Sequence, residues 1–252
     1  MVLKNGNTYP TGFYLNELGV PAKALYDAGY DLVFATPKGN RPALDVTSDN
    51  VKYFGNNQKR YDDIRSLYVS LTDLRRPKDL QTVINEGLDQ YDGIFIPGGH
   101  APMTDLIASP ELGKILRHFH EQNKPTAVIC HGVCALASTV SDPEAYRKAL
   151  VDGDFSRAQA IAGDWIYKGY GMTAFSSTED ILGEIKMGGP VPFFPETALQ
   201  SAGGIVEVGP QRQSHTHIHN ELISGQNPQS DEALCPILLD ALAAKNKKVI
   251  NP

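Results

Sequence analysis

Short apolar runs alternate with amphipathic stretches along most of the chain. Several runs are too short for helices and end in glycine, proline or polar turn residues, which predicts buried strands. These strands cover residues 32–35, 94–96, 126–129, 165–167, 172–175, 205–208 and 222–224. Between them apolar residues recur at helical spacing, most clearly over 110–121, 193–202 and 233–245. The alternation predicts an α/β fold with a doubly wound, mostly parallel, flavodoxin-like sheet and helices on both faces.

One cysteine stands between a predicted strand and a predicted helix. Cys130 follows the strand 126–129 and precedes small and apolar residues over 133–139 that suit a helix packed on a sheet. Such a nucleophile elbow presents its side chain at the carboxyl end of the sheet, above the positive end of the helix. That position lowers a thiol's pKa, and His131 can add a base or a cation. The alternative is a buried structural thiol.

A second strand-to-helix unit lies just upstream, in the sequence Asp-Gly-Ile-Phe-Ile-Pro-Gly-Gly-His of residues 92–100. Pro97, Gly98 and Gly99 end the strand, and paired glycines let the backbone approach whatever occupies the neighbouring crevice. Their amides could form an oxyanion hole. With the helix 110–121 between them, the two strands form one right-handed βαβ crossover.

Together these motifs resemble a known family. Residues 92–100, followed about thirty residues later by Ala-Val-Ile-Cys-His-Gly at 127–132, resemble the PfpI superfamily, relatives of the class I glutamine amidotransferases. Thr-Gly-Phe-Tyr-Leu-Asn-Glu-Leu at 11–18 resembles the glutamate-bearing helix of the heat-shock chaperones with glyoxalase III activity. Residues 222–228 resemble their segment near the C-terminus. The resemblance spans about residues 11–245.

The resemblance also implies a site. Cys130 is expected to be the nucleophile, with His131 beside it, and Glu17 to hydrogen-bond the sulfur and carry a proton. An acid must orient the imidazole. By ungapped spacing from Phe175 that acid is Asp180, with Glu179 as the alternative; both could instead simply favour a helix N-terminus. The residues expected around the oxyanion and substrate are Gly98, Gly99, His100 and Gly132.

Length and composition favour one PfpI-like domain over residues 1–252, with insertions or cover helices at 40–90 and 141–163. The family fold opens with a strand, whereas only three residues precede the polar stretch 4–8; either that strand is short or the sequence begins downstream of the natural start. The 23 basic and 29 acidic residues are scattered, which argues against nucleic acid or an anionic membrane as partner. No apolar run suggests a membrane span or secretory signal.

Two further residue sets deserve a chemical interpretation. His215, His217 and His219 alternate along a strand and share a face, but metal sites usually draw ligands from several segments, so no metal is expected. The three cysteines form no disulfide framework and no CxxC pair, which favours a reducing, cytoplasmic location. Cys134 could resolve an oxidised Cys130 but is expected to pack, and Cys235 is expected in the core.

The preferred hypothesis is a glutathione-independent glyoxalase III that converts methylglyoxal to lactate without a cofactor. Its partners would be a small aldehyde and a second copy of the chain in a homodimer. The rival hypothesis is a stress-response holdase that binds unfolded client proteins, or a sensor whose thiol is oxidised. A peptidase or amidase ranks lower, and fold alone does not decide the substrate.

Overall fold

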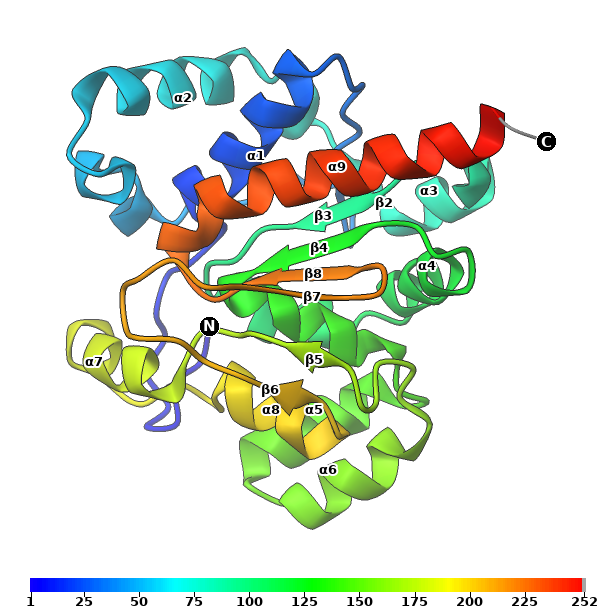
Figure 1. The fold of residues 1–252 in the computed structure, drawn as a ribbon. Coiled ribbons are helices and arrows are strands. Elements are labelled where there is room, and N and C mark those ends of the chain that lie inside the picture. Colours follow the sequence, from blue (N-terminus) through cyan, green and yellow to red (C-terminus); the bar gives the residue numbers. More distant parts are fainter. Residues whose placement is uncertain (251–252) are drawn as a thin grey trace.

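The computed structural model describes residues 1–250, with side chains described as far as residue 245, and centres on a four-stranded sheet (Figure 1). Its strand order is β3-β4-β8-β7. The strands β3 (Ile94–Ile96), β4 (Thr126–Ile129) and β8 (Leu222–Gly225) are parallel, and β7 (Thr216–His219) is antiparallel to β8. Two further parallel pairs join β1 (Ala35–Thr36) to β2 (Lys78–Asp79) and β5 (Gly171–Met172) to β6 (Ile205–Val206). The predicted α/β class is confirmed.

Helices cover both faces of the central sheet. On one face α1 (Leu15–Asp27) and α9 (Asp231–Ile250) pack on Ala127 and Ile129 of β4. On the other, α4 (Pro110–Glu121) and the 3₁₀ helix η7 (Cys130–Thr139) pack around Val128. Because successive side chains of a strand point to opposite faces, all four residues of β4 are buried.

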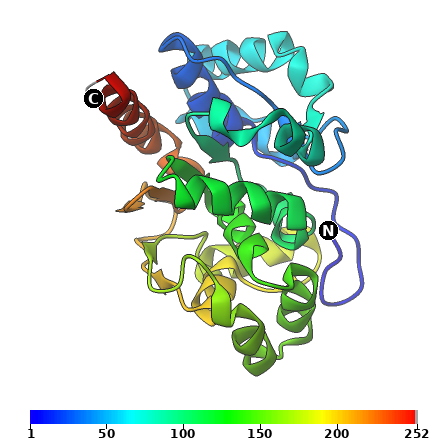
Figure 2. The same ribbon diagram turned by 90° about the vertical axis from the view of Figure 1, so that its right-hand side faces the viewer.

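The remaining helices lie around this core, with α2 and α6 at opposite ends of the molecule (Figures 1 and 2). They are α2 (Gln58–Ser70), α3 (Leu80–Glu86), α5 (Pro143–Asp152), α6 (Phe155–Ile161), α7 (Ser177–Met187) and α8 (Pro195–Ala202). Short 3₁₀ turns are η1 (Val46–Ser48), η2 (Val51–Phe54), η3 (Asp73–Arg75), η4 (Leu88–Gln90), η5 (Ala101–Met103), η6 (Leu106–Ala108), η8 (Ala162–Asp164) and η9 (Pro228–Ser230). The predicted insertion 40–90 contains α2, α3 and β2, and 141–163 contains α5 and α6. No helix among residues 1–250 combines the length and the apolar character needed to cross a membrane.

The helix α4 shows how the local sequence sets an element. Ser109 caps it, accepting a hydrogen bond from the Leu112 amide at 3.2 Å, and Pro110 occupies the first helical position. Its buried face carries Leu112, Ile115, Leu116 and Phe119, as the spacing predicts. The predicted helix 110–121 is therefore confirmed.

Three predicted elements are absent or of another type, and two predicted strands are shorter than expected: 172–175 corresponds to β5 at Gly171–Met172, and 205–208 to β6 at Ile205–Val206. Within residues 1–250, β1 pairs with β2 over Ala35–Thr36 alone, so residues 32–34 form no ladder, and Val33 is 47% exposed. Residues 165–167 form a turn rather than a strand; their apolar character reflects burial of Trp165, whose indole donates to the Leu136 carbonyl at 2.9 Å. The helix expected at 133–139 begins earlier, at Cys130, and is a 3₁₀ helix with every residue buried.

The first residues of the chain fold back on themselves. Val2 forms an antiparallel bridge with Thr8, and the amino group of Met1 donates to the Tyr9 carbonyl at 2.8 Å. Leu3 is buried in the larger core cluster. These residues therefore pair with one another and not with the central sheet.

The fully buried Leu116 of α4 tests the packing between α4 and the sheet. Leu116→Ala should lower the free energy of unfolding by about 2–5 kcal/mol, because it removes apolar contacts and leaves a cavity. Urea unfolding measures the change, and Lys114→Ala at an exposed position of the same helix is the control, expected within about 0.5 kcal/mol of wild type. Equal effects of the two variants would contradict the described packing.

Candidate active site

Cys130 occupies a strained turn between β4 and η7. Its φ is +59°, a left-handed conformation that costs a non-glycine residue about 1–3 kcal/mol, and its side chain is only 3% exposed. The neighbouring loops approach so closely that two positions must be glycine. A Cβ at Gly98 would lie 2.6 Å from the Cys130 Cβ, and one at Gly132 would lie 2.7 Å from the carbonyl oxygens of Ile96 and Pro97. The carboxyl ends of β3 and β4 thus hold Cys130 in place.

The two ring nitrogens of His131 contact two different groups, the Cys130 sulfur and the Asp180 carboxylate. Its Nδ1 lies 3.2 Å from the Cys130 Sγ, and its Nε2 lies 3.0 Å from Oδ1 of Asp180 in the first turn of α7. Burial alone would raise the pKa of Asp180, but the His131 and His100 imidazoles lower it below its ordinary value. An ionised Asp180 accepts the Nε2 proton, so Nδ1 of the neutral ring is free to accept the thiol proton.

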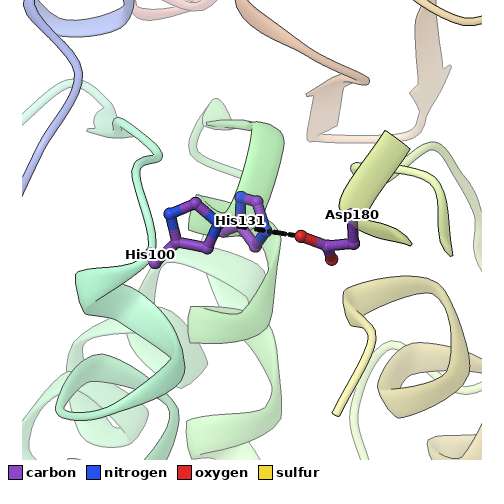
Figure 3. A group of neighbouring side chains, drawn as sticks. All are labelled: His100, His131 and Asp180. Atoms are coloured by element: carbon purple, nitrogen blue, oxygen red, sulfur yellow. Dashed lines mark hydrogen bonds and ion pairs between the residues drawn. The ribbon is translucent and has the colours of Figure 1, made fainter. Parts of the chain in front are cut away.

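Two rings enclose the His131 imidazole. The centroid of His100 lies 4.2 Å away, that of Phe175 lies 4.5 Å away, and His100 Nε2 is 3.7 Å from Asp180 Oδ1. Figure 3 shows His131 between His100 and the carboxylate. Burial lowers the pKa of His131, and the nearby His100 adds to this effect while Asp180 opposes it. The neutral imidazole is therefore the resting form at neutral pH.

Glu17 lies in the first turn of α1 and is completely buried. Neither carboxyl oxygen has a well-aligned hydrogen-bond partner among the described residues. Burial raises the pKa of Glu17 to about 8, although the nearby Cys130 thiol and Gly98 amide act to lower it. The carboxyl group thus remains protonated at neutral pH and can donate a proton toward the sulfur.

The predicted lowering of the Cys130 pKa is wrong for the free protein. Burial raises the pKa of this thiol well above its ordinary value, and the Glu17 carboxyl adds to the shift. The backbone N–H groups of His131 and Gly99 act in the opposite direction. Because the thiol is desolvated, its deprotonation depends on transfer of the proton to His131 rather than on solvent.

Glu179, the alternative orienting acid, is occupied elsewhere. Its Oε1 accepts from the Arg212 amide and the Asn227 side chain at 2.8 and 2.9 Å. Its Oε2 accepts from Ser176 Oγ at 2.7 Å and Gln226 Nε2 at 2.9 Å. Glu179 therefore ties the start of α7 to the loops around β7 and β8, and Asp180 is the acid that contacts His131.

The described residues contain one group with metal-ligand spacing, and it is not the predicted set His215, His217 and His219, of which His215 precedes β7. The ligand atoms of His100, His131 and Asp180 lie within 4.8 Å of one another. His219 instead accepts a hydrogen bond from the Gly171 amide through Nδ1 at 3.1 Å. The histidines of β7 thus face the neighbouring strand β5.

The other two cysteines are buried thiols without disulfides. Burial raises the pKa of Cys134 far above its ordinary value and that of Cys235 to about 12. The Cys235 thiol donates to the Asp231 carbonyl at 3.1 Å. Both are therefore poor nucleophiles in this structure.

A polar pair beside Glu17 was not anticipated from the sequence. The buried Asn16 amide donates at 2.9 Å both to the Asp231 carboxylate and to the Pro228 carbonyl, which joins the start of α1 to that of α9. Burial raises the pKa of Asp231 to about 6, and its charge in turn helps to raise that of Glu17. In the sequence, the position of Asn16 directly before Glu17 is what could have indicated this buried pair.

These features define an α/β protein whose polar site is built around one cysteine at a strand-to-helix turn. Residues 10–155 match the family model described as ThiJ/PfpI family-like. The chain belongs to the ThiJ/PfpI family, which confirms the resemblance found in the sequence.

Individual relatives carry enzyme names. The protein/nucleic acid deglycase HchA of Pseudomonas aeruginosa is 25% identical over 257 residues, covering 96% of this chain and 78% of the relative. A glutathione-independent glyoxalase of Schizosaccharomyces pombe is 23% identical over 246 residues, covering 94% and 93%. The crystal structure of glyoxalase III from Candida albicans aligns with a TM-score of 0.65 at 20% identity over 94% of this chain and 90% of that chain, which shows a shared fold.

Substitutions of Glu179 and Asp180 should affect different properties, the first stability and the second the reactivity of Cys130. Glu179→Gln should lower the free energy of unfolding by about 1–3 kcal/mol, because an amide nitrogen would face hydrogen-bond donors. Asp180→Asn should largely retain stability but slow alkylation of Cys130 by iodoacetamide at least about tenfold, since the imidazolium loses its counter-charge. Urea unfolding and labelling rates measure the two effects, and the opposite assignment of phenotypes would contradict the geometry.

The buried Glu17 should make stability fall as pH rises. From about pH 5 to pH 8 the unfolded chain releases this proton while the folded protein keeps it, so rising pH favours unfolding. Relative to Glu17→Gln, which binds no proton in either state, the wild type should lose at least about 1.4 kcal/mol of unfolding free energy over this range. Urea unfolding at several pH values tests this, and parallel pH profiles would show that Glu17 titrates normally.

Proposed function

We propose that this protein is a glutathione-independent glyoxalase that converts methylglyoxal to lactate with Cys130 as nucleophile. The observation that carries the proposal is the pair of proton carriers at one sulfur, with His131 Nδ1 at 3.2 Å and the protonated Glu17 carboxyl group as its second neighbour. The names of the deglycase and glyoxalase relatives support an enzyme acting on reactive carbonyl compounds. A small aldehyde also suits a thiol that is 3% exposed better than a peptide does.

The first step forms a carbon–sulfur bond. His131 Nδ1 takes the thiol proton, with the resulting imidazolium stabilised by Asp180, and the thiolate attacks the aldehyde carbon C1. Glu17 then gives its proton to the new alkoxide, which completes a hemithioacetal. The N–H groups of Gly99 and His131, which favour the charged form of the thiol in the free protein, stabilise the negative charge at the reacting centre in this proposal.

The second step moves hydrogen between carbons. The Glu17 carboxylate removes the proton from C1 and returns one to C2, while the hydroxyl proton passes from the oxygen on C1 to that on C2. The product is a lactoyl thioester on Cys130. Water attacks the thioester and gives one proton to the Glu17 carboxylate, lactic acid leaves, and the released thiolate recovers its proton from His131. The sum is one methylglyoxal and one water giving one lactic acid.

Turnover of methylglyoxal by the pure protein without glutathione tests the proposal. Cys130→Ala should abolish lactate formation, and Glu17→Gln should lower kcat by about 10²–10⁴-fold, because it removes the proton carrier. Iodoacetamide should still label Cys130 in Glu17→Gln, which separates loss of proton transfer from loss of the thiol. Lactate formation by the wild type that is no faster than by Cys130→Ala would contradict the proposal. Unchanged turnover in Glu17→Gln would show that Glu17 takes no part in the mechanism.

A chaperone function is the second candidate because α7 exposes an apolar stripe. Ile181, Leu182 and Ile185 are 51%, 47% and 88% exposed, and residues one turn apart share a helix face. Such a surface suits unfolded clients or, in a homodimer, a second copy of the chain. An oxidation sensor is less well supported, because the Cys130 thiol is buried and has a raised pKa.

Suppression of client aggregation separates the two candidates. A holdase should retain suppression in Cys130→Ala and lose most of it in Ile181→Asp/Ile185→Asp, because the charged side chains remove the apolar contact surface. Val46→Asp, at an isolated position that is 77% exposed, is the matched control. Light scattering of the same variants shows whether the stripe instead joins two copies. Suppression that is equal in all variants would contradict a role for α7.

A further inference from the structure

Three ionisable side chains from three separate segments meet on the side of His131 that faces away from the sulfur. His100 directly precedes η5, after the loop that follows β3, whereas His131 belongs to η7 and Asp180 to the first turn of α7. Their ligand atoms lie within 4.8 Å of one another, and Figure 3 shows the carboxylate directed at the imidazoles. Two imidazoles and one carboxylate form the ligand set of many zinc sites.

The distances within this group suit a tetrahedral ion. Asp180 Oδ1 lies 3.0 Å from His131 Nε2 and 3.7 Å from His100 Nε2. In a tetrahedral zinc site with metal–ligand distances of about 2.0–2.2 Å, neighbouring ligand atoms are about 3.3–3.6 Å apart. The two observed distances lie on either side of this range, so small side-chain shifts would bring the three ligand atoms around one ion.

Two buried polar atoms of the group have no hydrogen-bond partner in the part of the chain that the structure describes. They are Asp180 Oδ2 and His100 Nδ1. Buried polar atoms are rarely left without a partner, so the carboxylate retains binding capacity beyond its contact with His131. The His100 side chain is 11% exposed, whereas those of His131 and Asp180 are 1% and 0% exposed. An ion would therefore enter past His100.

Protonation of the two buried ligands also favours a metal ion. Metals bind the neutral imidazole and the ionised carboxylate. Burial lowers the pKa of His131, and the neighbouring imidazoles lower that of Asp180, so both groups are already in these forms at neutral pH. Two nitrogen ligands disfavour Mg²⁺ and Ca²⁺, which take oxygen ligands, and suit Zn²⁺.

We propose that these three side chains bind one Zn²⁺ ion, and that the bound ion prevents His131 from acting as the base for Cys130. The ion would bond to His131 Nε2, which in the free protein donates its proton to Asp180. The neutral ring keeps one proton, which then resides on Nδ1. Nδ1 lies 3.2 Å from the Cys130 sulfur and would donate toward it instead of accepting the thiol proton. Zinc binding and proton transfer to His131 therefore exclude each other.

This exclusion makes the site inhibitory. In the proposed glyoxalase reaction the first step transfers the thiol proton to His131, so inhibition rests on the proposed function, whereas binding of the ion does not. The rival ligand is the Cys130 sulfur, because zinc binds thiolates. Burial raises the pKa of this thiol well above its ordinary value, which disfavours the thiolate that a sulfur–zinc bond requires.

Equilibrium dialysis of the whole protein against Zn²⁺ at neutral pH tests the ligand set. Wild type should bind one ion per chain, and His100→Gln should weaken the affinity at least about tenfold, because it removes one of three ligands. Cys130→Ala should bind zinc like wild type. His217→Gln on β7 is the matched control for histidine loss and should also retain the affinity. Mg²⁺ at the same concentration should not displace the zinc.

The ¹⁵N NMR signals of the histidine side chains test the effect on His131 in wild type, without any substitution. Its proton should reside on Nε2 before zinc is added and on Nδ1 afterwards, and EDTA should restore the first state. Urea unfolding shows whether His100→Gln is folded; if it is not, Cys130→Ala and the NMR signals decide.

Four results would overturn the proposal. They are no zinc binding by wild type, equal binding by a folded His100→Gln, loss of binding in Cys130→Ala or His217→Gln, and a His131 proton that stays on Nε2 in the presence of zinc.

Discussion

The site depends on one backbone constraint, the left-handed conformation of Cys130 at the end of a fully buried strand. That φ of +59° turns the chain sharply from β4 into η7 and brings the His131 ring back over the sulfur. A strained residue persists only where its surroundings determine its conformation. Here the loops after β3 and β4 pack so closely that Gly98 and Gly132 leave no room for a Cβ. The strain at Cys130 is thus held by parallel pairing of β3 with β4.

Burial controls the chemistry of the site more than helix polarity does. It raises the pKa of both Cys130 and Glu17 and lowers that of His131, so each group favours its neutral form. Asp180 alone keeps its charge, because two imidazoles surround it. A site of neutral groups around one fixed anion keeps its protons on the protein until a substrate arrives. This arrangement suits transfer of protons between neighbouring atoms rather than exchange with solvent.

The same parallel sheet links the site to the rest of the molecule. Strands β3, β4 and β8 bring three distant segments together. The helix α1, which carries Glu17, packs on the sheet face formed by Ala127 and Ile129, next to Cys130. The strand β3 leads directly into the loop at Gly98, whose backbone lies against Glu17 and Cys130. The pairing of β3 with β4 therefore also sets the position of this loop at the site.

The sequence by itself determined the strands β3, β4 and β8, the capped helix α4 and the placement of Cys130 between a strand and a helix. Each of these follows from local patterns, namely apolar runs bounded by glycines, a serine cap before a proline, and a cysteine at a run's end. The family could also be predicted from the sequence, because each of its motifs, such as residues 92–100 and 127–132, is a continuous stretch of the chain.

Only the tertiary structure decided which acid serves His131 and how the thiol is protonated. Glu179 and Asp180 are adjacent and chemically alike, and their difference arises because helix rotation turns one toward Gln226 and the other toward His131. The thiol's raised pKa likewise depends on how many groups surround the sulfur from distant segments. The buried strand predicted at 32–35 is wrong for the same reason, since an apolar run becomes a buried strand only when other elements pair with it and cover it.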